Sequence, residues 1–259
     1  FAPFALVALM LVLTVFGVFG RMPSFEELEN PRSNLATEIY SEDGKVIGTF
    51  FVQNRSYVQY ADLYPSDSTL HIRLAGHEVP PIVAALIATE DVRFRTHSGI
   101  DIPSLARVAV KTLLLQNTSQ GGGSTITQQL IKNLTKQDDI TVQRKLLEIF
   151  QALEFEKSYD KEEIMEWYLN IVYFGEGCNG VYTAAETYFG KEPKDLTLAE
   201  CASIIGITNN PSKYDPFISR ENNKARQETI LKQMYEQGYI NKEQYDEAVA
   251  QELVFVRSE

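Results

Sequence analysis

Basic residues are in the minority in this sequence of 259 residues. It contains 24 Lys and Arg against 35 Asp and Glu, which gives a formal net charge of −11 at pH 7. A general nucleic-acid binder needs a positive surface, so this composition argues against a nucleic-acid partner. The acidity is unevenly spread, because residues 90–148 carry eight Lys or Arg against six Asp or Glu. We therefore expect an anionic ligand to be attracted to this central stretch.

Cysteine and histidine are scarce, with two and three residues. Cys178 and Cys201 could form one disulfide outside the cytoplasm, but each lies in an apolar, helix-like context where a buried free thiol is commoner. His71 and His77 are accompanied by no carboxylate or Cys pattern typical of a metal site. We expect both histidines at the surface.

Charged side chains are absent from residues 1–20. About 20 apolar residues are enough for a helix to cross the ~30 Å hydrocarbon core of a membrane. The run is longer than the apolar region of a signal peptide, and no Ala-x-Ala-like cleavage site follows it. We expect a transmembrane helix over residues 1–20 and a polar connector over residues 21–36.

The remaining sequence predicts a mainly α domain with a small β-hairpin element. Residues 37–52 form two strand-like runs around an Asp43-Gly44 turn, which is typical of a hairpin. Almost everything after residue 80 has helical patterning, and capping-box spacings begin at Asp160, Thr197 and Asn241. We place this domain over residues 37–250, with residues 251–259 as the start of a linker to a further domain.

The apolar stretch at residues 82–88 ends in a carboxylate, Glu90. Pro is tolerated in a first turn, so a buried helix should begin near Pro80-Pro81. The negative end of the helix dipole and the apolar surroundings both disfavour a charged Glu90, which is the direction that a general base near neutral pH requires. The alternative is an ordinary solvated helix end.

Residues 122–133 combine a glycine loop with a capped helix. Thr125 and Gln128 have capping-box spacing, and the helix should bury Ile126, Leu130 and Leu134. Its remaining polar side chains should be available to a ligand: Gln128, Gln129, Lys132 and Asn133. A glycine loop that leads into a helix N-terminus favours anions, although an ordinary capped helix explains the pattern equally well.

Residues 141–156 predict an amphipathic helix. Val142, Leu146, Ile149, Phe150 and Leu153 recur at helical spacing and should form its buried face, opposite a stripe of Arg144, Glu148 and Gln151. Arg144 and Glu148 are four residues apart and share a face. Taken singly, this pair is best explained as a surface ion pair.

Four motifs follow one another in order. They are Glu-Asp-x-x-Phe-x-x-His-x-Gly-x-Asp at residues 90–101, Gly-Gly-Ser-Thr-Ile-Thr-Gln-Gln-Leu-x-Lys-Asn at 122–133, Arg-Lys-x-x-Glu at 144–148 and Glu-Trp-Tyr-Leu-Asn-x-x-Tyr-Phe-Gly at 166–175. Together they strongly resemble the peptidoglycan glycosyltransferase domain of class A penicillin-binding proteins. The resemblance covers roughly residues 37–250.

This resemblance implies a lysozyme-like helical domain, anchored by one span on the outer face of the cytoplasmic membrane, that polymerises lipid II into glycan strands. Glu90 corresponds to the general base, Glu148 to a second catalytic carboxylate, and Lys132 and Arg144 to the residues that hold the donor diphosphate. The other motif positions expected to line the cleft are Asp91, Phe94, His97, Ser124, Thr125, Gln128, Gln129 and Asn133. The implied partners are lipid II, the growing glycan chain, the membrane and other cell-wall synthesis proteins.

Displacement of a diphosphate needs positive charge for the leaving group, supplied by cationic side chains or by a divalent ion such as Mg²⁺ or Mn²⁺, for which Glu148 is the candidate ligand. A glycan-cleaving enzyme of lysozyme type is the enzymatic alternative, but it has no diphosphate for Lys132 and Arg144 to hold. A non-catalytic scaffold should have lost Glu90 or Lys132. We expect the aromatic residues of the fourth motif in the core rather than stacked on sugars: Trp167, Tyr168, Tyr173 and Phe174.

Overall fold

The computed structural model of this chain describes residues 37–40, 46–50, 57–66, 70–115, 123–135 and 142–256, and the side chains of 57–66, 70–108, 123–135 and 144–256. The predicted transmembrane helix at residues 1–20, the connector and the Asp43-Gly44 turn lie outside this described part. Among the described helices, none combines the length and the apolar character needed to cross a membrane.

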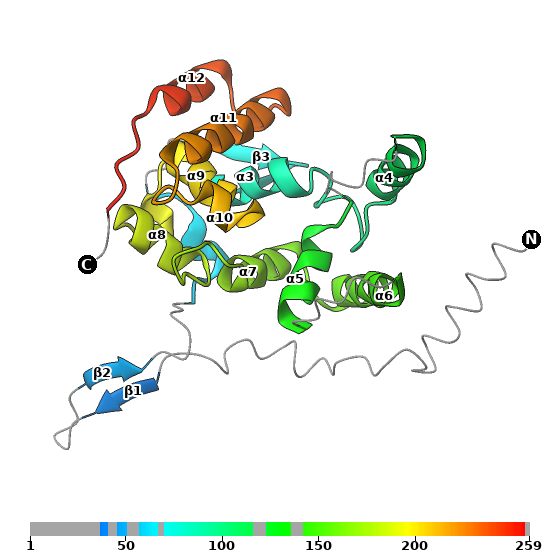
Figure 1. Ribbon diagram of the computed structural model, residues 1–259, viewed down its shortest axis with the longest axis horizontal. Coiled ribbons are helices and arrows are strands. Elements are labelled where there is room, and N and C mark those ends of the chain that lie inside the picture. Colours follow the sequence, from blue (N-terminus) through cyan, green and yellow to red (C-terminus); the bar gives the residue numbers. More distant parts are fainter. Residues whose placement is uncertain are drawn as a thin grey trace, which may run out of the picture.

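The described chain is mainly helical with two small antiparallel hairpins, as Figure 1 shows. Strand β1 (Thr37–Tyr40) pairs with β2 (Val46–Phe50), which confirms the predicted hairpin strands. A second hairpin, β3 (Ile72–Leu74) with β4 (His77–Val79), was not predicted. His71 and His77 are both exposed at this hairpin, which confirms their surface position.

Ten α-helices are described. They are α3 (Pro81–Glu90), α4 (Ile102–Leu115), α5 (Ile126–Thr135), α6 (Val142–Ser158), α7 (Lys161–Ile171), α8 (Val181–Phe189), α9 (Leu198–Asn209), α10 (Pro211–Tyr214), α11 (Arg220–Glu236) and α12 (Lys242–Ala250). Short 3₁₀ turns occur at η2 (Tyr60–Leu63) and η3 (Pro193–Asp195). The predicted capping boxes at Asp160, Thr197 and Asn241 are all formed, so local sequence determines where α7, α9 and α12 begin.

Helix α3, which ends at the site, is deeply buried. Its residues from Pro81 to Ala88 are all buried, and it packs against both α9 and α11. Each fully buried Val, Leu or Ile contributes about 1.5–3 kcal/mol, so the helix is held rigidly in place. In Figure 1 these three helices lie together in one lobe, whereas α5, α6 and α7 lie in a second group beside it. Glu90, the last residue of α3, therefore sits on a fixed support.

Both cysteines are buried free thiols. Burial is the main reason why the pKa values of Cys178 and Cys201 are raised. The structure thus confirms the buried-thiol interpretation, and thiols of this kind are poor nucleophiles because the thiolate form is disfavoured.

Helix α6 turns a different face to the core from the one that its apolar residues predict. Leu147, Glu148, Gln151, Ala152 and Phe155 are buried. The predicted apolar face is only half-buried: Leu146, Ile149, Phe150 and Leu153. The prediction of the buried face was therefore wrong. The physical reason is that α6 packs against α5, and the buried Glu148 has cationic partners on α6 itself, Arg144 and Lys145, that offset the cost of desolvating it.

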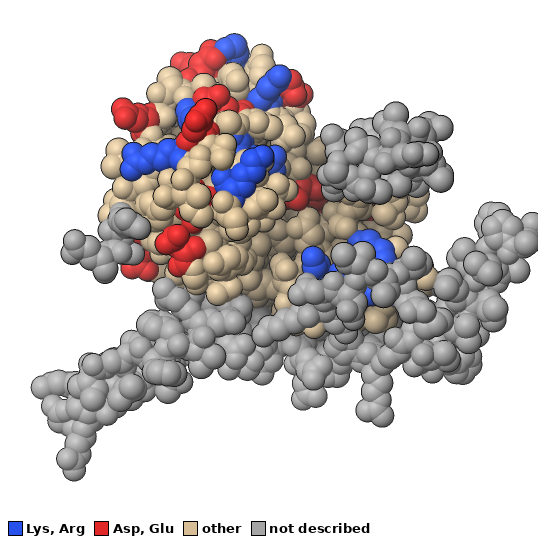
Figure 2. Space-filling view, in the orientation of Figure 1, with Lys and Arg blue, Asp and Glu red and all other residues tan. Residues whose placement is uncertain are grey.

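The surface of the lobe that contains α8 to α12 carries both signs of charge. Figure 2 shows Lys and Arg side chains intermixed with Asp and Glu over this lobe. The visible part of it offers no continuous basic surface of the kind that a phosphate backbone requires.

Candidate active site

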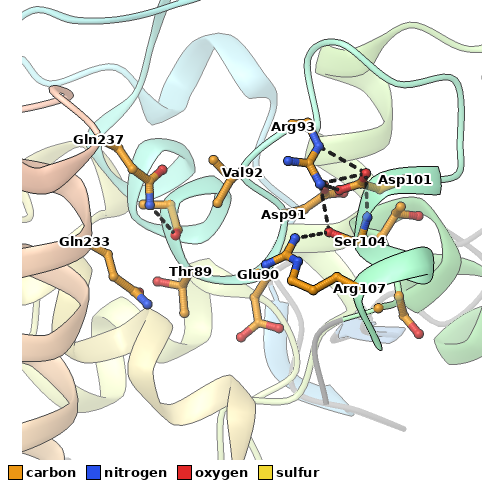
Figure 3. Close-up of a pocket in the computed structure, with 14 residues that line it drawn as sticks. Thr89, Glu90, Asp91, Val92, Arg93, Asp101, Ser104, Arg107, Gln233 and Gln237 are labelled. Carbon is orange, nitrogen blue, oxygen red and sulfur yellow. Dashed lines mark hydrogen bonds and ion pairs between the residues drawn. The ribbon is translucent and has the colours of Figure 1, made fainter. Parts of the chain in front are cut away.

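Two cavities meet at Glu90. The first has a volume of about 390 Å³ and the second about 430 Å³, and Glu90 and Ser124 line both. Figure 3 shows the first cavity, with Gln233 of α11 and Gln237 just after that helix on one side of Glu90 and the Arg93, Asp101 and Arg107 group on the other. The second is lined by residues of α5, α7 and the end of α9, including Gln129, Lys132, Asn133, Tyr168, Tyr173, Thr208 and Asn209.

The Glu90 carboxylate is held from two directions. Its Oε2 lies 3.4 Å from Nε2 of Gln129, and its Oε1 lies 3.6 Å from a guanidinium nitrogen of Arg226. The Tyr168 hydroxyl donates to Oε1 of Gln129 at 3.1 Å. Burial raises the pKa of Tyr168, and the neighbouring charge of Glu90 adds to the effect. With a side-chain exposure of 18%, Glu90 is positioned but still accessible.

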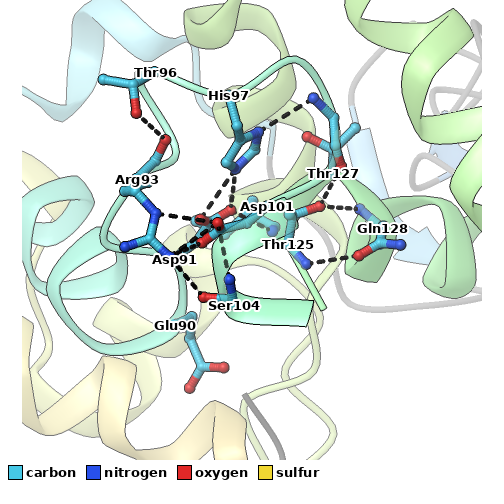
Figure 4. Close-up of polar contacts among 12 residues, drawn as sticks. Glu90, Asp91, Arg93, Thr96, His97, Asp101, Ser104, Thr125, Thr127 and Gln128 are labelled. Atoms are coloured by element: carbon cyan, nitrogen blue, oxygen red, sulfur yellow. Dashed lines mark hydrogen bonds and ion pairs between the residues drawn. The ribbon is translucent and has the colours of Figure 1, made fainter. Parts of the chain in front are cut away.

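The loop after Glu90 is tied to the start of α5 by Asp91. This carboxylate accepts a hydrogen bond from the backbone N–H of Ile126 at 3.0 Å and contacts Nε2 of His97 at 2.9 Å (Figure 4). The N–H of Gly99 donates to Nδ1 of His97 at 3.2 Å, so the ring proton lies on Nε2 and is donated to Asp91. Glu90 points away from this network in Figure 4, which leaves its carboxylate free for the cavities.

Gly99 is required by its surroundings. Its φ of +91° lies in the region that favours glycine, and a Cβ there would meet the carbonyl oxygen of Ala152 at 2.5 Å. The glycine of the first motif thus lets the loop pass close to the backbone of α6.

A buried charged pair lies behind the His97 network. Glu156 of α6 accepts from Thr127 of α5 and from Lys161 of α7, each at 2.5 Å. Burial lowers the pKa of Lys161 although the contact with Glu156 opposes this effect. Lys161 also lies over the ring of Phe94, at 4.5 Å from its centroid. These contacts join three helices beneath the first motif.

Arg93 and Asp101 form a bidentate ion pair on the wall of the first cavity. The Nη2 atom of Arg93 lies 2.9 and 2.8 Å from the two carboxylate oxygens of Asp101, and it donates to Ser104. Arg107 donates to the same hydroxyl at 2.7 Å. Burial alone would raise the pKa of Asp101, but the hydrogen bonds from Ser104 and Arg93 outweigh it and hold the pKa below its usual value.

Some residues of the second motif cap helix α5, and others line the cavities. Thr125 and Gln128 form the predicted capping box, with Thr125 N–H donating to Gln128 at 2.9 Å and Gln128 N–H donating to Thr125 at 3.2 Å. Ser124, Gln129, Lys132 and Asn133 line the cavities, as expected of ligand-contacting residues.

Three of the expected cleft residues are buried beneath the cavities instead. Gln128 is 0% exposed and Phe94 is 1% exposed, and the His97 side chain is 7% exposed. The expectation that they line the cleft is corrected: Gln128 is engaged in capping α5, while Phe94 and His97 pack under the motif loop. Asp91 and Thr125 do border the first cavity although both are buried.

The third motif forms a cationic cluster around a buried carboxylate. Glu148 contacts the ammonium group of Lys145 at 2.5 Å and a guanidinium nitrogen of Arg144 at 3.6 Å. Lys145 also donates to the hydroxyl of Ser124 at 2.7 Å, which connects the cluster to both cavities. Arg144 and Glu148 therefore do share a face, but they form a largely buried pair rather than a surface one, with side-chain exposures of 18% and 8%.

Some cavity residues were not recognised from the sequence. Tyr173, expected in the core, is 47% exposed and lines the second cavity, whereas Tyr168 and Phe174 are buried as predicted. Trp167 is partly buried against the core. Arg226 lies outside all four motifs. The helical spacing of Arg226 and Gln233, with Gln237 as the residue that follows the helix, was the signal available for α11.

A comparison with known protein families identifies the family of this chain. The transglycosylase family profile matches residues 43–235. The chain belongs to the transglycosylase family. It is thus a glycosyltransferase by family, and the four motifs, Glu90 and Arg226 all fall within the matched region.

Curated relatives of this transglycosylase are penicillin-binding proteins 1A. That of Aquifex aeolicus is 38% identical over 95% of this chain and 32% of its own length, and that of Pseudomonas aeruginosa is 37% identical over 90% and 26%. The chain thus spans about a third or less of these relatives. A crystal structure of penicillin-binding protein 1A from Haemophilus influenzae aligns with a TM-score of 0.44 at 24% identity, over 87% of this chain and 22% of that one.

The residues of this transglycosylase do not fit the expected divalent ion at Glu148. Both carboxylate oxygens face cations, Lys145 and Arg144, so an ion would have to displace them. In the described part of the chain, no three His, Cys, Asp or Glu side chains are grouped as metal ligands. The positive charge around Glu148 is therefore supplied by the side chains of Arg144 and Lys145.

Proposed function

We propose that this chain is a peptidoglycan glycosyltransferase that polymerises lipid II into β-1,4-linked glycan strands, with inversion at the donor sugar and loss of the lipid diphosphate. The observation that carries the proposal is the place of Glu90, a partly exposed carboxylate where two cavities meet. One cavity can take the donor and the other the acceptor, so that the reacting atoms meet beside one base.

Glu90 acts as the general base. The 4-hydroxyl of the acceptor sugar attacks the donor carbon that bears the diphosphate, and Glu90 takes the hydroxyl proton as the new bond forms. The contacts from Gln129 and Arg226 orient the carboxylate for this transfer. Because Glu90 terminates a rigid buried helix, its position does not depend on the substrate being bound.

Lys132 and Arg144 stabilise the leaving diphosphate. Lys132 lines the second cavity, and the cluster of Arg144, Lys145 and Glu148 is joined to that cavity through Ser124. Negative charge grows on the diphosphate as the bond breaks, and fixed cations stabilise that charge more than they stabilise the ground state. Glu148 orients the two cations of its cluster, while Ser124, Thr125, Gln129 and Asn133 contact the sugars.

The lipid-linked substrate indicates where in the cell the domain works. A lipid-linked diphosphate lies at headgroup level, so we propose that the domain works on the outer face of the cytoplasmic membrane and is anchored by residues 1–20. The growing glycan chain and other cell-wall synthesis proteins are its proposed partners. The relatives named above are penicillin-binding proteins, which agrees with a role in building the cell wall.

A glycan-cleaving enzyme of lysozyme type is the rival that shares a carboxylate at this place. Such an enzyme acts with a pair of carboxylates that flank the scissile bond. Here three cations lie around the second cavity and Ser124, namely Lys132, Lys145 and Arg144. The second carboxylate, Glu148, is paired with two of them. This charge favours a substrate that carries a diphosphate, and therefore a transferase.

The test is the product made from lipid II. Purified protein should convert labelled lipid II into a polymer that lysozyme digests, and Glu90→Gln should reduce the rate by about 10²–10⁴-fold while leaving the fold intact, because the amide keeps its size but accepts no proton. Soluble fragments released from mature glycan by the wild type, with no polymer from lipid II, would refute the proposal.

A further inference from the structure

Arg226 is placed beside Glu90 by a part of the chain that none of the four motifs contains. It belongs to α11, and its guanidinium nitrogen lies 3.6 Å from Oε1 of Glu90. The two side chains have exposures of 17% and 18%, so the pair is shielded from water enough for the charge to matter. Among the described residues, Glu90 is the acidic partner found for Arg226.

The packing around Arg226 fixes its course toward Glu90. Gly206 lies in the middle of α9, and a Cβ there would meet Cγ of Arg226 at 2.9 Å. A glycine inside a helix costs about 1 kcal/mol relative to Ala, so its presence is explained by the room that it leaves for Arg226. The guanidinium also lies 5.8 Å from the ring centroid of Tyr214.

We propose that Arg226 is a positioning residue whose positive charge couples to the Glu90 carboxylate and holds it directed between the two cavities. This inference rests on the proposed function of Glu90 as general base. A nearby opposite charge favours the ionised form of a carboxylate, and only the ionised form can accept the acceptor proton. Arg226 acts through Glu90 and does not contact the substrate.

Other charged groups near Glu90 have partners of their own. Arg93 pairs with Asp101, Asp91 contacts His97, and Arg107 donates to the hydroxyl of Ser104. The ionisable groups that face the cavities from the packed elements are Asp91, Arg93, Asp101 and Arg107 in the first, and Lys132, Tyr168 and Tyr173 in the second. Arg226 is the cation for which a contact with the Glu90 carboxylate is found in the described part of the chain.

The experiment compares the pH dependence of lipid II polymerisation in four variants with that of the wild type. Arg226→Gln removes the charge, and the acidic limb of the kcat profile should move to higher pH by about one unit, the lower end of the effect of an opposite charge at this distance. Arg226→Lys keeps the charge and should leave the limb near its wild-type position. Gly206→Ala displaces the Arg226 stem and should move the limb in the same direction as Arg226→Gln.

Arg220→Gln is the matched control, because it removes an arginine from the exposed first residue of the same helix, where the guanidinium lies over Phe255 instead. It should leave the limb in place. A folded Arg226→Gln variant with an unmoved limb overturns the proposal. So does an increase in KM for lipid II without a shift of the limb, since that would assign Arg226 to substrate binding.

A second measurement does not depend on activity. Titration of carboxyl-labelled glutamates by ¹³C NMR, with the Glu90 signal assigned by its absence in Glu90→Gln, should show that Glu90 protonates at higher pH in Arg226→Gln than in the wild type. An unchanged Glu90 titration overturns the charge coupling even in a protein that makes no polymer. Failure of the proposed function and failure of this inference are thereby distinguished.

Discussion

At the scale of single residues, the site depends on charges that are partly removed from water. Lys132 is exposed at the second cavity, whereas Arg144 and Glu148 are largely buried. An exposed ion pair contributes little to stability because water screens it. When a bound substrate displaces that water, the same charges act at a lower effective dielectric constant. The contribution of these cations should therefore appear in turnover more than in stability.

Replacing either cation should slow polymerisation selectively. Lys132→Ala and Arg144→Ala should each lose about 2–4 kcal/mol of transition-state stabilisation, or about 30- to 900-fold in rate, if each offsets charge on the leaving diphosphate. Steady-state rates with labelled lipid II measure this loss. Lys157→Ala is the control, because Lys157 lies on α6 with a side-chain exposure of 70% and pairs only with the exposed Glu154 in the described contacts. Equal rates for all three variants would contradict the assignment.

The Arg93–Asp101 pair makes the stability of the domain depend on pH. The pKa of Asp101 is lowered below 3.8 in the folded state, so its contribution is complete above 3.8 and is lost as the pH falls through the lower, folded value. We expect Asp101→Asn to be less stable than the wild type at pH 6, and the difference to shrink below 3.8.

Urea unfolding at several pH values measures this difference in free energy. Asp246→Asn on α12 is the control, because Asp246 is 56% exposed and its ion pair with Lys242 is solvated. A constant difference between wild type and Asp101→Asn over the whole range would show that the pair does not act through ionisation.

At the scale of elements, the start of α5 joins the motifs. The N–H of its first residue, Ile126, donates to Asp91, and Thr125 before it caps the helix and donates to the carbonyl of Gly99 at 2.7 Å. The helix N-terminus and the loop that follows Glu90 are thus fixed together. Gln129, one turn further on, reaches the Glu90 carboxylate because of this attachment.

Thr125→Ala should lower both stability and activity. Loss of the cap costs about 1 kcal/mol, and the released α5 should no longer hold Gln129 against Glu90. Thr197→Ala is the matched control, since Thr197 caps α9 through the same capping box at a position outside both cavities. Thermal unfolding should show similar losses for the two variants, whereas polymerisation should fall only in Thr125→Ala. An equal effect on activity would argue against a specific role for the α5 attachment.

At the scale of the whole molecule, the two groups of helices meet at the end of α3. Glu90 is reached by Gln129 from the group of α5, α6 and α7, and by Arg226 from the group of α3, α9 and α11. A carboxylate at such a junction responds to both groups at once. Substrate contacts made by either group can therefore act on the same base.

Removal of residues 1–20 should weaken turnover in membranes more than it harms folding. A lipid-linked diphosphate lies at headgroup level, so an anchored domain meets it at a much higher local concentration than a free one. Polymerisation of lipid II in liposomes, compared with polymerisation in detergent, measures the effect. Equal activity of the complete and shortened chains on liposomes would contradict this prediction, and equal thermal unfolding of both is its control.

Features that depend on near neighbours along the chain followed from the amino-acid sequence alone. The buried helix that ends at Glu90, the capping boxes and the hairpin strands were all predicted correctly, because periodicity, prolines and cap residues act within one or two turns. The proximity of Arg144 and Glu148 followed in the same way from helical spacing.

Which face each helix buries, and which distant residues it contacts, depends instead on how the helices pack together. Helix α6 buries Glu148 rather than Phe150, since its contact with α5 and the neighbouring cations outweighs its own apolar pattern. Tyr173 lies in a cavity and not in the core, and Arg226 reaches Glu90 from 136 positions away in the chain. Contacts between residues so far apart depend on how helices pack, and no local pattern in a single sequence encodes that packing.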